Sequence, residues 1–181
     1  PKVMEAAISS GAHMINDVRA LSEPDALDIL ATSKVSVCLM HMLGEPGTMQ
    51  ISPEYKSVSR DVKNFLLSRI EECKKVGISL DRLIVDPGFG FGKTLDHNLE
   101  LLANLRELTG LGCPLLVGLS RKSMIDKILS REGKERLSAS LGLAVIALER
   151  GANLIRTHDV RETVDAISMW IAVNRAKNLS E

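Results

Sequence analysis

The stretch Leu83-Ile84-Val85-Asp86-Pro87-Gly88-Phe89-Gly90-Phe91-Gly92-Lys93 decides the fold because it joins a strand pattern to a loop pattern. Its three leading apolar residues are typical of a short buried strand, which ends in an acid and a proline. Three alternating glycines then allow the backbone to come close to a ligand. A carboxylate at the tip of a strand, beside such a loop, is the layout of a binding site.

The composition excludes several classes of function. The chain has 181 residues, of which 45% are hydrophobic and 25% charged, so we expect residues 1–181 to form a single globular domain. Lys plus Arg and Asp plus Glu both number 23, and aromatic residues make up 3%, which predicts neither nucleic acid nor an anionic membrane as a partner. No apolar run approaches the roughly 20 residues that span a bilayer.

The cysteines and the first residues carry two further expectations. Cys38, Cys73 and Cys113 are odd in number and far apart, without a C-x-x-C motif, so we expect no disulfide framework and no zinc site. This usage favours a reducing cytosol as the compartment. The chain begins directly on a predicted helix, residues 1–10, which indicates a domain that lacks its first strands.

Short apolar segments alternate with helical patterns along the chain. The alternation predicts an α/β fold with five strands, at residues 13–18, 35–40, 83–85, 115–119 and 153–158. Such short apolar strands are typical of a parallel sheet that helices cover on both faces. Two architectures fit this pattern: an open doubly wound sheet, and a (β/α)₈ barrel without about its first three strands, since a complete barrel has eight units and about 250 residues. Composition alone does not choose between them.

Polar residues gather where the predicted strands end. They are Asn16, Asp17, His41, Asp86, Ser120, Arg121, Lys122, Arg156 and His158. In both architectures this edge of the sheet binds ligands. A lone Asp before Pro most often caps a turn, and a lone Asn most often forms an Asx turn. A carboxylate such as Asp86 can also accept hydrogen bonds from the two adjacent N–H groups of a 2-amino-4-oxo pyrimidine ring, which Asn16 could help to recognise.

Three cationic or titratable residues have placements that indicate function. Lys122 lies in the first turn of a predicted helix, where the helix dipole disfavours a cation. Arg156 and His158 are two residues apart on a strand and therefore share a face. Because the neighbouring strand residues are apolar, we expect Arg156 to be buried, with either an anionic substrate group or Asp159 or Glu162 as its partner.

Two apparent nucleotide-binding motifs do not hold. Gly88, Gly90 and Gly92 are spaced G-x-G-x-G, which is not the dinucleotide fingerprint. Residues 92–94 imitate the end of a phosphate-binding P-loop, but Pro87 stands where its first glycine belongs. The sequence therefore assigns no role to the lysine at position 93.

Five motifs, one at the end of each predicted strand, carry a resemblance to a known family. They are Ile15-Asn16-Asp17-Val18-Arg19, Cys38-Leu39-Met40-His41-Met42, residues 86–93, Gly118-Leu119-Ser120-Arg121-Lys122-Ser123 and Ile155-Arg156-Thr157-His158-Asp159-Val160. In this order they resemble the dihydropteroate synthases, the pterin-binding enzymes of folate biosynthesis that sulfonamides target. The resemblance covers essentially the whole chain.

The resemblance implies a fold and a reaction. Residues 1–181 would be the C-terminal portion of a pterin-binding (β/α)₈ barrel, a partial barrel with about five parallel strands and alternating helices. The protein would be a cytoplasmic transferase that joins 6-hydroxymethyl-7,8-dihydropterin diphosphate to p-aminobenzoate, with 7,8-dihydropteroate and pyrophosphate as products. Pyrophosphate would leave while positive charge grows on the pterin methylene, which the arylamine would then attack.

The resemblance also assigns the site residues. The pterin site would consist of Asn16, Met40, Asp86 and Lys122. The p-aminobenzoate site would consist of Phe91, Gly118, Ser120 and Lys122. The catalytic residues would be Lys122, Arg156 and His158, and the last two would bind the diphosphate and stabilise the leaving anion.

The first barrel strands of the family have no counterpart in this chain. In the family they bring two mobile loops, an arginine, a pterin-contacting aspartate and the asparagine that holds Mg²⁺ and the diphosphate. The resemblance therefore implies Mg²⁺ as a cofactor, with no metal ligand within these 181 residues. We expect the 181 residues alone to lack synthase activity, and their open sheet edges to be covered in a homodimer or by a missing N-terminal segment.

Two other interpretations stay open. A pterin-binding methyltransferase domain would share the barrel and the pterin site but would not need Arg156 and His158 for a diphosphate. Preference for methyltetrahydrofolate over pterin diphosphate would favour it. A non-catalytic half-barrel would bind no ligand, so pterin diphosphate would leave its melting temperature unchanged.

Overall fold

Five short parallel strands form the centre of the structure. The computed structural model describes residues 1–45, 47–130 and 136–178. Its strands pair in chain order and are β1 (Met14–Asp17), β2 (Ser36–Met40), β3 (Leu83–Asp86), β4 (Leu116–Val117) and β5 (Leu154–Ile155). A parallel bridge between Val85 and Leu115 joins the three-stranded sheet to the β4–β5 pair. The strands predicted from the sequence are therefore confirmed, with ends that differ by a few residues.

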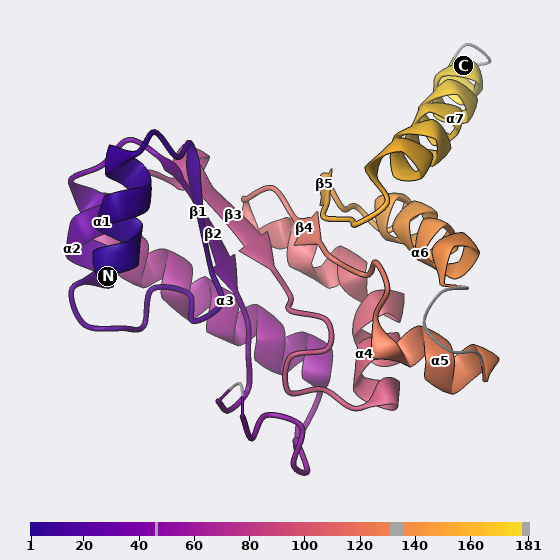
Figure 1. Ribbon diagram of the computed structural model, residues 1–181, viewed down its shortest axis with the longest axis horizontal. Coiled ribbons are helices and arrows are strands. Elements are labelled where there is room, and N and C mark those ends of the chain that lie inside the picture. Colours follow the sequence, from indigo (N-terminus) through magenta and orange to yellow (C-terminus); the bar gives the residue numbers. More distant parts are fainter. Residues whose placement is uncertain (46, 131–135, 179–181) are drawn as a thin grey trace.

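Helices follow every strand and cover the sheet. They are α1 (Lys2–Ser9), α2 (Ala26–Ala31), α3 (Val58–Lys75), α4 (Leu95–Ala103), α5 (Ser123–Leu129), α6 (Leu137–Glu149) and α7 (Val160–Asn178), with 3₁₀ turns at Leu80–Arg82 and Leu105–Leu111. Figure 1 shows α3 running along the three-stranded sheet, and α6 and α7 on the far side of the molecule from α1 and α2. Within the described residues the strands do not close on themselves, as in part of a (β/α)₈ barrel. None of the described helices is both long and apolar enough to cross a membrane.

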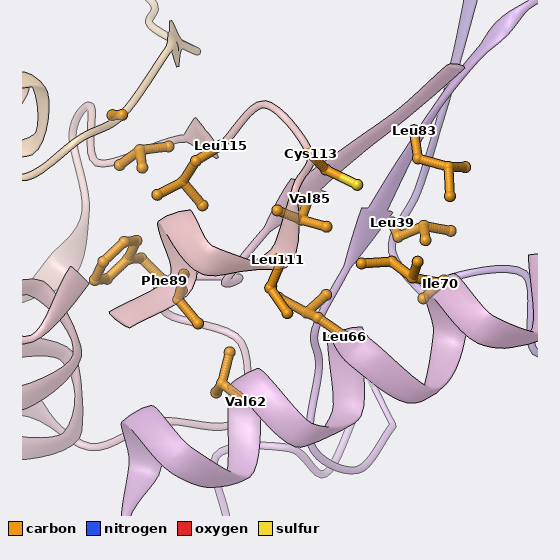
Figure 2. Close-up of a cluster of buried hydrophobic side chains, with 14 of the residues drawn as sticks. Leu39, Val62, Leu66, Ile70, Leu83, Val85, Phe89, Leu111, Cys113 and Leu115 are labelled. Atoms are coloured by element: carbon orange, nitrogen blue, oxygen red, sulfur yellow. The ribbon is translucent and has the colours of Figure 1, made fainter. Parts of the chain in front are cut away.

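The core lies between α3 and the three-stranded sheet. One face of α3 is apolar at helical spacing, and its residues Val62, Leu66 and Ile70 are at most 2% exposed. Figure 2 shows these side chains pointing toward Leu39 and Val85, which come from β2 and β3. The apolar residues of α3 pack here against those of the sheet, so this cluster holds β2 and β3 in place.

Asp96 is a candidate N-cap for the helix after β3, but helix α4 already begins at Leu95. Thr94 is the cap: its hydroxyl accepts the backbone N–H of His97, and its own N–H donates to the His97 ring. Asp96, which can also cap a helix, lies in the first turn instead. The apolar spacing predicts Leu99, Leu102 and Leu105 on the inner face: Leu102 and Leu105 are buried, but Leu99 is 39% exposed.

The apolar spacing of the last helix predicts one face formed by Val160, Val164, Ile167 and Ile171, of which only Ile167 is half-buried among the described residues. Val160 is 63% exposed and Val164 is 53% exposed. The same holds at the sheet edge, where the strand residues Leu154 and Ile155 are only half-buried. β5 is the last strand in the described sheet order, so it has a neighbour on one side only.

Replacing Leu66 by Ala should destabilise the fold strongly. Leu66 is fully buried, and truncation would leave a cavity between α3 and the sheet. We expect a loss of about 3 kcal/mol in the free energy of unfolding, measured by urea titration followed by circular dichroism. Leu67→Ala is the matched control, because Leu67 is 46% exposed on the same helix. A loss equal to that of the control would contradict the packing described above.

Candidate functional site

Asp86 is the buried centre of the rim formed by the strand ends. It is the last residue of β3 and is 1% exposed. Its Oδ1 accepts the backbone N–H of Gly88 at 2.8 Å, so one oxygen does cap the turn, as its position before Pro87 suggested. Its Oδ2 has no hydrogen-bond partner among the described residues. One buried acceptor therefore stays open toward the site.

Arg156 lies beside that open oxygen. Its Nη2 is 2.8 Å from Asp86 Oδ2, a close ion pair that lacks the alignment of a hydrogen bond. Its Nη1 donates to Asn16 Oδ1 at 3.4 Å. The guanidinium also lies over Gly118, where an added Cβ would be 2.8 Å from Nη2. Because Gly118 has no side chain, the guanidinium of Arg156 can occupy this space.

Two expectations about Arg156 were wrong. Its side chain is 43% exposed rather than buried, because β5 is an edge strand in the described sheet. Its structural partner is Asp86, whereas Asp159 pairs with Arg121. The ion-pair partner of Arg156 is not one of its neighbours in the sequence, because the parallel sheet brings the end of β3 within reach of the end of β5.

Lys122 approaches the same centre from the opposite side. It is the N-cap residue of α5, one position before the first turn in which it was expected. Its Nζ lies 4.6 Å from the centroid of the Phe91 ring, a cation–π contact. Burial lowers the pKa of Lys122, the Asp86 carboxylate opposes that shift, and Arg156 adds to it. Lys122 therefore interacts with two parts of the site: its charge is attracted by the Asp86 carboxylate, and its ammonium lies over the Phe91 ring.

Ser120 fixes the imidazole of His158. The Ser120 hydroxyl oxygen accepts the backbone N–H of His158 at 3.2 Å and lies 3.0 Å from Nδ1 of the ring. Ser120 is 8% exposed, so this contact is shielded from water. The hydrogen bond to Nδ1 can run in either direction: where the hydroxyl donates to Nδ1, the ring carries its proton on Nε2. In that tautomer His158 is a donor at Nε2.

Met40 lies below the loop that follows Asp86. It pairs with Asp86 in the register of β2 and β3 and is 1% exposed. Its Cγ would be 3.4 Å from a Cβ added at Gly88. The structure therefore brings the residues predicted for the pterin site, Asn16, Met40, Asp86 and Lys122, to one rim, with Phe91, Gly118, Ser120, Arg156 and His158 around them.

Sequence reasoning missed Lys93. Its ammonium is 3% exposed and contacts His41 Nδ1, Gly88 O and Phe91 O at 2.9–3.1 Å. The only local signal was a lysine directly after a loop of glycines and aromatics, and the imitation of a P-loop end concealed it. His41 stood among the polar strand ends, but nothing in the sequence predicted its pairing with Lys93.

Burial sets the charge states of this pair. Burial, with the Lys93 ammonium adding to it, lowers the pKa of His41 to about 3, so the ring is neutral near pH 7. Burial also lowers the pKa of Lys93 to about 7, while the Asp86 carboxylate opposes that shift. A neutral His41 ring can accept at Nδ1 and carry its proton on Nε2.

The described residues do not fit a Mg²⁺ site of their own. Within 1–45, 47–130 and 136–178, no three His, Cys, Asp or Glu side chains gather closely enough to hold a metal. The open oxygen of Asp86 faces a guanidinium instead of a second carboxylate. A hard divalent ion takes several oxygen ligands, so we derive no step through a metal here.

His41→Gln should reduce the acid sensitivity of the fold. The folded pKa of His41 is about 3, below its ordinary value of 6.5, so only the unfolded state takes up a proton between these values. Stability contributed by the neutral ring is therefore present above about pH 6.5 and lost as the pH falls toward 3. Gln keeps an acceptor for Lys93 but does not titrate. We expect the loss of unfolding free energy between pH 6.5 and 4.5 to shrink by roughly 2 kcal/mol in urea titrations.

The exposed His13 provides the matched control for this measurement. His13→Gln should leave the pH dependence of the unfolding free energy as in the unchanged protein. An equal reduction in both variants would show that burial of His41 is not the cause.

Comparison with known proteins agrees with this arrangement. The family model described as "Pterin binding enzyme" matches residues 1–158. The dihydropteroate synthase of Escherichia coli K12 is 50% identical over 177 residues, which cover 98% of this chain and 63% of that protein. The chain thus spans less than two thirds of the length of this relative.

Solved structures agree in fold. A Yersinia pestis dihydropteroate synthase with a sulfonamide drug complex has a TM-score of 0.93 at 47% identity, covering 97% of this chain and 64% of that one. A Xanthomonas albilineans dihydropteroate synthase in complex with 7,8-dihydropteroate has a TM-score of 0.90 at 46% identity, covering 96% and 64%. These likenesses confirm both the partial barrel and the resemblance stated from the five motifs, and the chain belongs to the pterin binding enzyme family.

Proposed function

We propose that this chain forms the pterin-binding part of a dihydropteroate synthase. The reaction joins 6-hydroxymethyl-7,8-dihydropterin diphosphate to p-aminobenzoate and releases pyrophosphate. The observation that carries the proposal is the open acceptor Oδ2 of Asp86, buried at the strand end, with a guanidinium beside it. The 50% identity to the Escherichia coli synthase and the dihydropteroate complex of the Xanthomonas albilineans enzyme support it.

The guanidinium of Arg156 indicates which ligand Asp86 would bind. A guanidinium presents two N–H groups on a planar N–C–N edge, and a carboxylate accepts both. The 2-amino-4-oxo edge of a pterin presents the same planar pair of N–H donors. Asp86 would accept this pair when Arg156 moves aside, and Asn16, which Arg156 also contacts, would face the same ring.

Release of Arg156 would make it available for the leaving group. During the reaction the bond between the methylene carbon and the diphosphate oxygen breaks, and its electron pair leaves with pyrophosphate. Arg156 and the Nε2–H of His158 would donate to that anion, which stabilises the charge as it develops. The nitrogen of p-aminobenzoate then forms the new bond to the methylene carbon and loses a proton.

The second substrate would lie against the glycine loop. Phe91 and Lys122 are already in contact, and both face the loop side of Asp86. The aromatic ring of p-aminobenzoate would pack near Phe91, with Gly118 and Ser120 on its border. The proposal also includes Mg²⁺ as the cofactor, a homodimer or a missing N-terminal segment that covers the open sheet edges, and a cytoplasmic location.

Asp86→Asn should remove most of the affinity for the pterin. The amide would place an N–H donor where the ligand also presents N–H groups, while its oxygen still accepts from Gly88. We expect the Kd for pterin diphosphate to rise about 100-fold, roughly 3 kcal/mol, in isothermal titration calorimetry of the purified protein. Asp81→Asn is the control, because Asp81 is exposed in the 3₁₀ turn before the other end of β3.

The same titration discriminates between the proposed function and its rivals. Preference for methyltetrahydrofolate over pterin diphosphate in the unchanged protein would overturn the synthase in favour of a methyltransferase. No binding of either ligand would instead favour a non-catalytic fragment.

A further inference from the structure

Lys93 makes three contacts with its three ammonium protons. Nζ lies 2.9 Å from His41 Nδ1, 3.0 Å from Gly88 O and 3.1 Å from Phe91 O. His41 is neutral near pH 7 and the other two atoms are carbonyl oxygens, so the protonated form of Lys93, whose pKa burial lowers to about 7, donates in each contact. In that form all three protons are directed at protein atoms, so Lys93 acts on the loop rather than on a ligand.

The two carbonyls belong to opposite ends of the glycine loop, residues 88–92. This loop presses against the chain that leaves β2: a Cβ at Gly88 would be 1.9 Å from His41 O, and one at Gly92 would be 2.3 Å from Leu43 O. Both glycines have positive φ angles, +68° and +65°. The inner face of the loop therefore has no side chain at these positions, and the ammonium of Lys93 joins the two ends to His41 instead.

The outer side of the loop is held separately. Tyr55 donates its hydroxyl proton to Gly92 O at 2.8 Å, and Gly90 N–H donates to Asn98 Oδ1 at 2.8 Å. Within the loop, the Phe91 N–H donates to Gly88 O at 3.1 Å. Lys93 binds the same Gly88 carbonyl together with that of Phe91, and it joins both to His41.

Both groups that would face the substrates depend on this loop. The N–H of Gly88 orients Asp86 Oδ1, while Phe91 carries the ring in contact with Lys122. A shift of the loop would turn the carboxylate and move the ring together. A misplacement of about 1 Å at a binding group can cost up to about 100-fold in rate.

A buried ammonium is a costly way to hold a loop. Moving a charge out of water is unfavourable unless it is well partnered, and an apolar side chain would fill the same space without that penalty. The nearest opposing charge is the Asp86 carboxylate, with Lys122 repelling from the α5 side. The three contacts of Nζ with fixed protein atoms indicate that Lys93 provides the geometry of the loop rather than stability.

We propose that Lys93 is a positioning residue: it clamps both ends of the glycine loop so that Asp86 and Phe91 present fixed surfaces to the two substrates. The proposal rests on the function given above for the substrates themselves. The clamp can be measured independently of any substrate.

The test compares Lys93→Met with Lys127→Met in the purified protein. Met has a similar length and no donors. Lys127 is an exposed lysine on α5 at the mouth of the pocket beside Gly90, so its variant loses a nearby positive charge without removing the contacts of Lys93 with the loop carbonyls. Amide hydrogen exchange of residues 87–92 should become about tenfold faster in Lys93→Met and stay unchanged in Lys127→Met. The Kd for pterin diphosphate should rise about tenfold in Lys93→Met and stay unchanged in Lys127→Met, while the folded fraction measured by circular dichroism stays the same in both variants.

A merely structural role has a different signature. If Lys93→Met only reduces the folded fraction, the number of binding sites in the titration falls while the Kd stays unchanged, which overturns the proposal. Unchanged exchange of residues 87–92 overturns it as well. Lys93→Gln keeps two N–H donors without the charge and should show smaller effects on exchange and Kd, and it replaces Lys93→Met if that variant does not fold.

The two proposals fail separately. If the unchanged protein binds no pterin diphosphate, the proposed function fails, and the exchange of residues 87–92 still decides whether Lys93 clamps the loop. If binding is normal but Lys93→Met leaves the Kd for pterin diphosphate unaltered, only the role of Lys93 fails.

Discussion

The close approach of two backbones, where the glycine loop meets the chain leaving β2, is the constraint on which the site depends. Gly88 and Gly92 come so near His41 O and Leu43 O that a Cβ would overlap these oxygens. The parallel register of β2 and β3 sets this approach by pairing Met40 with Asp86. In the same register the His41 N–H donates to Asp86 O at 2.9 Å. Strand pairing and this hydrogen bond therefore fix the backbone of Asp86, independently of the contacts that its carboxylate makes.

Charge is distributed around Asp86 in an uneven way. One buried carboxylate lies among Lys93, Lys122 and Arg156, and its field acts on both lysines. The cationic excess matches a site for an anionic substrate, because a cleft lined by one sign of charge concentrates ligands of the other sign. Only Arg156 is substantially exposed and able to change partners, whereas Lys93 is sealed beneath the loop. The three cations thus have separate roles: one clamps, one contacts Phe91 and one can exchange partners.

The sequence predicted much of the fold and part of the site. The five strands and the amphipathic face of α3 followed from apolar periodicity, and Asp86 followed from its place between a strand and three glycines. The partner of Arg156 could not be found in this way, because hydrogen bonds such as that between Arg156 and Asn16 join residues 140 positions apart. The sequence did not predict the role of Lys93, because residues 92–94 imitate the end of a phosphate-binding loop. Its contacts with His41, Gly88 and Phe91 are apparent only in the tertiary structure, where Lys93 is buried.

By itself, the sequence determined which segments form strands and helices and which residue types stand at the strand ends. These are local properties, set by side-chain periodicity, by glycine and by proline. The five motifs also carried the family resemblance, since they are read along the chain. Only the tertiary structure decided which charges meet, which oxygen of Asp86 stays open and what Lys93 holds. Parallel pairing brings distant strand ends to one rim, and burial then determines the cost and the partners of each charge.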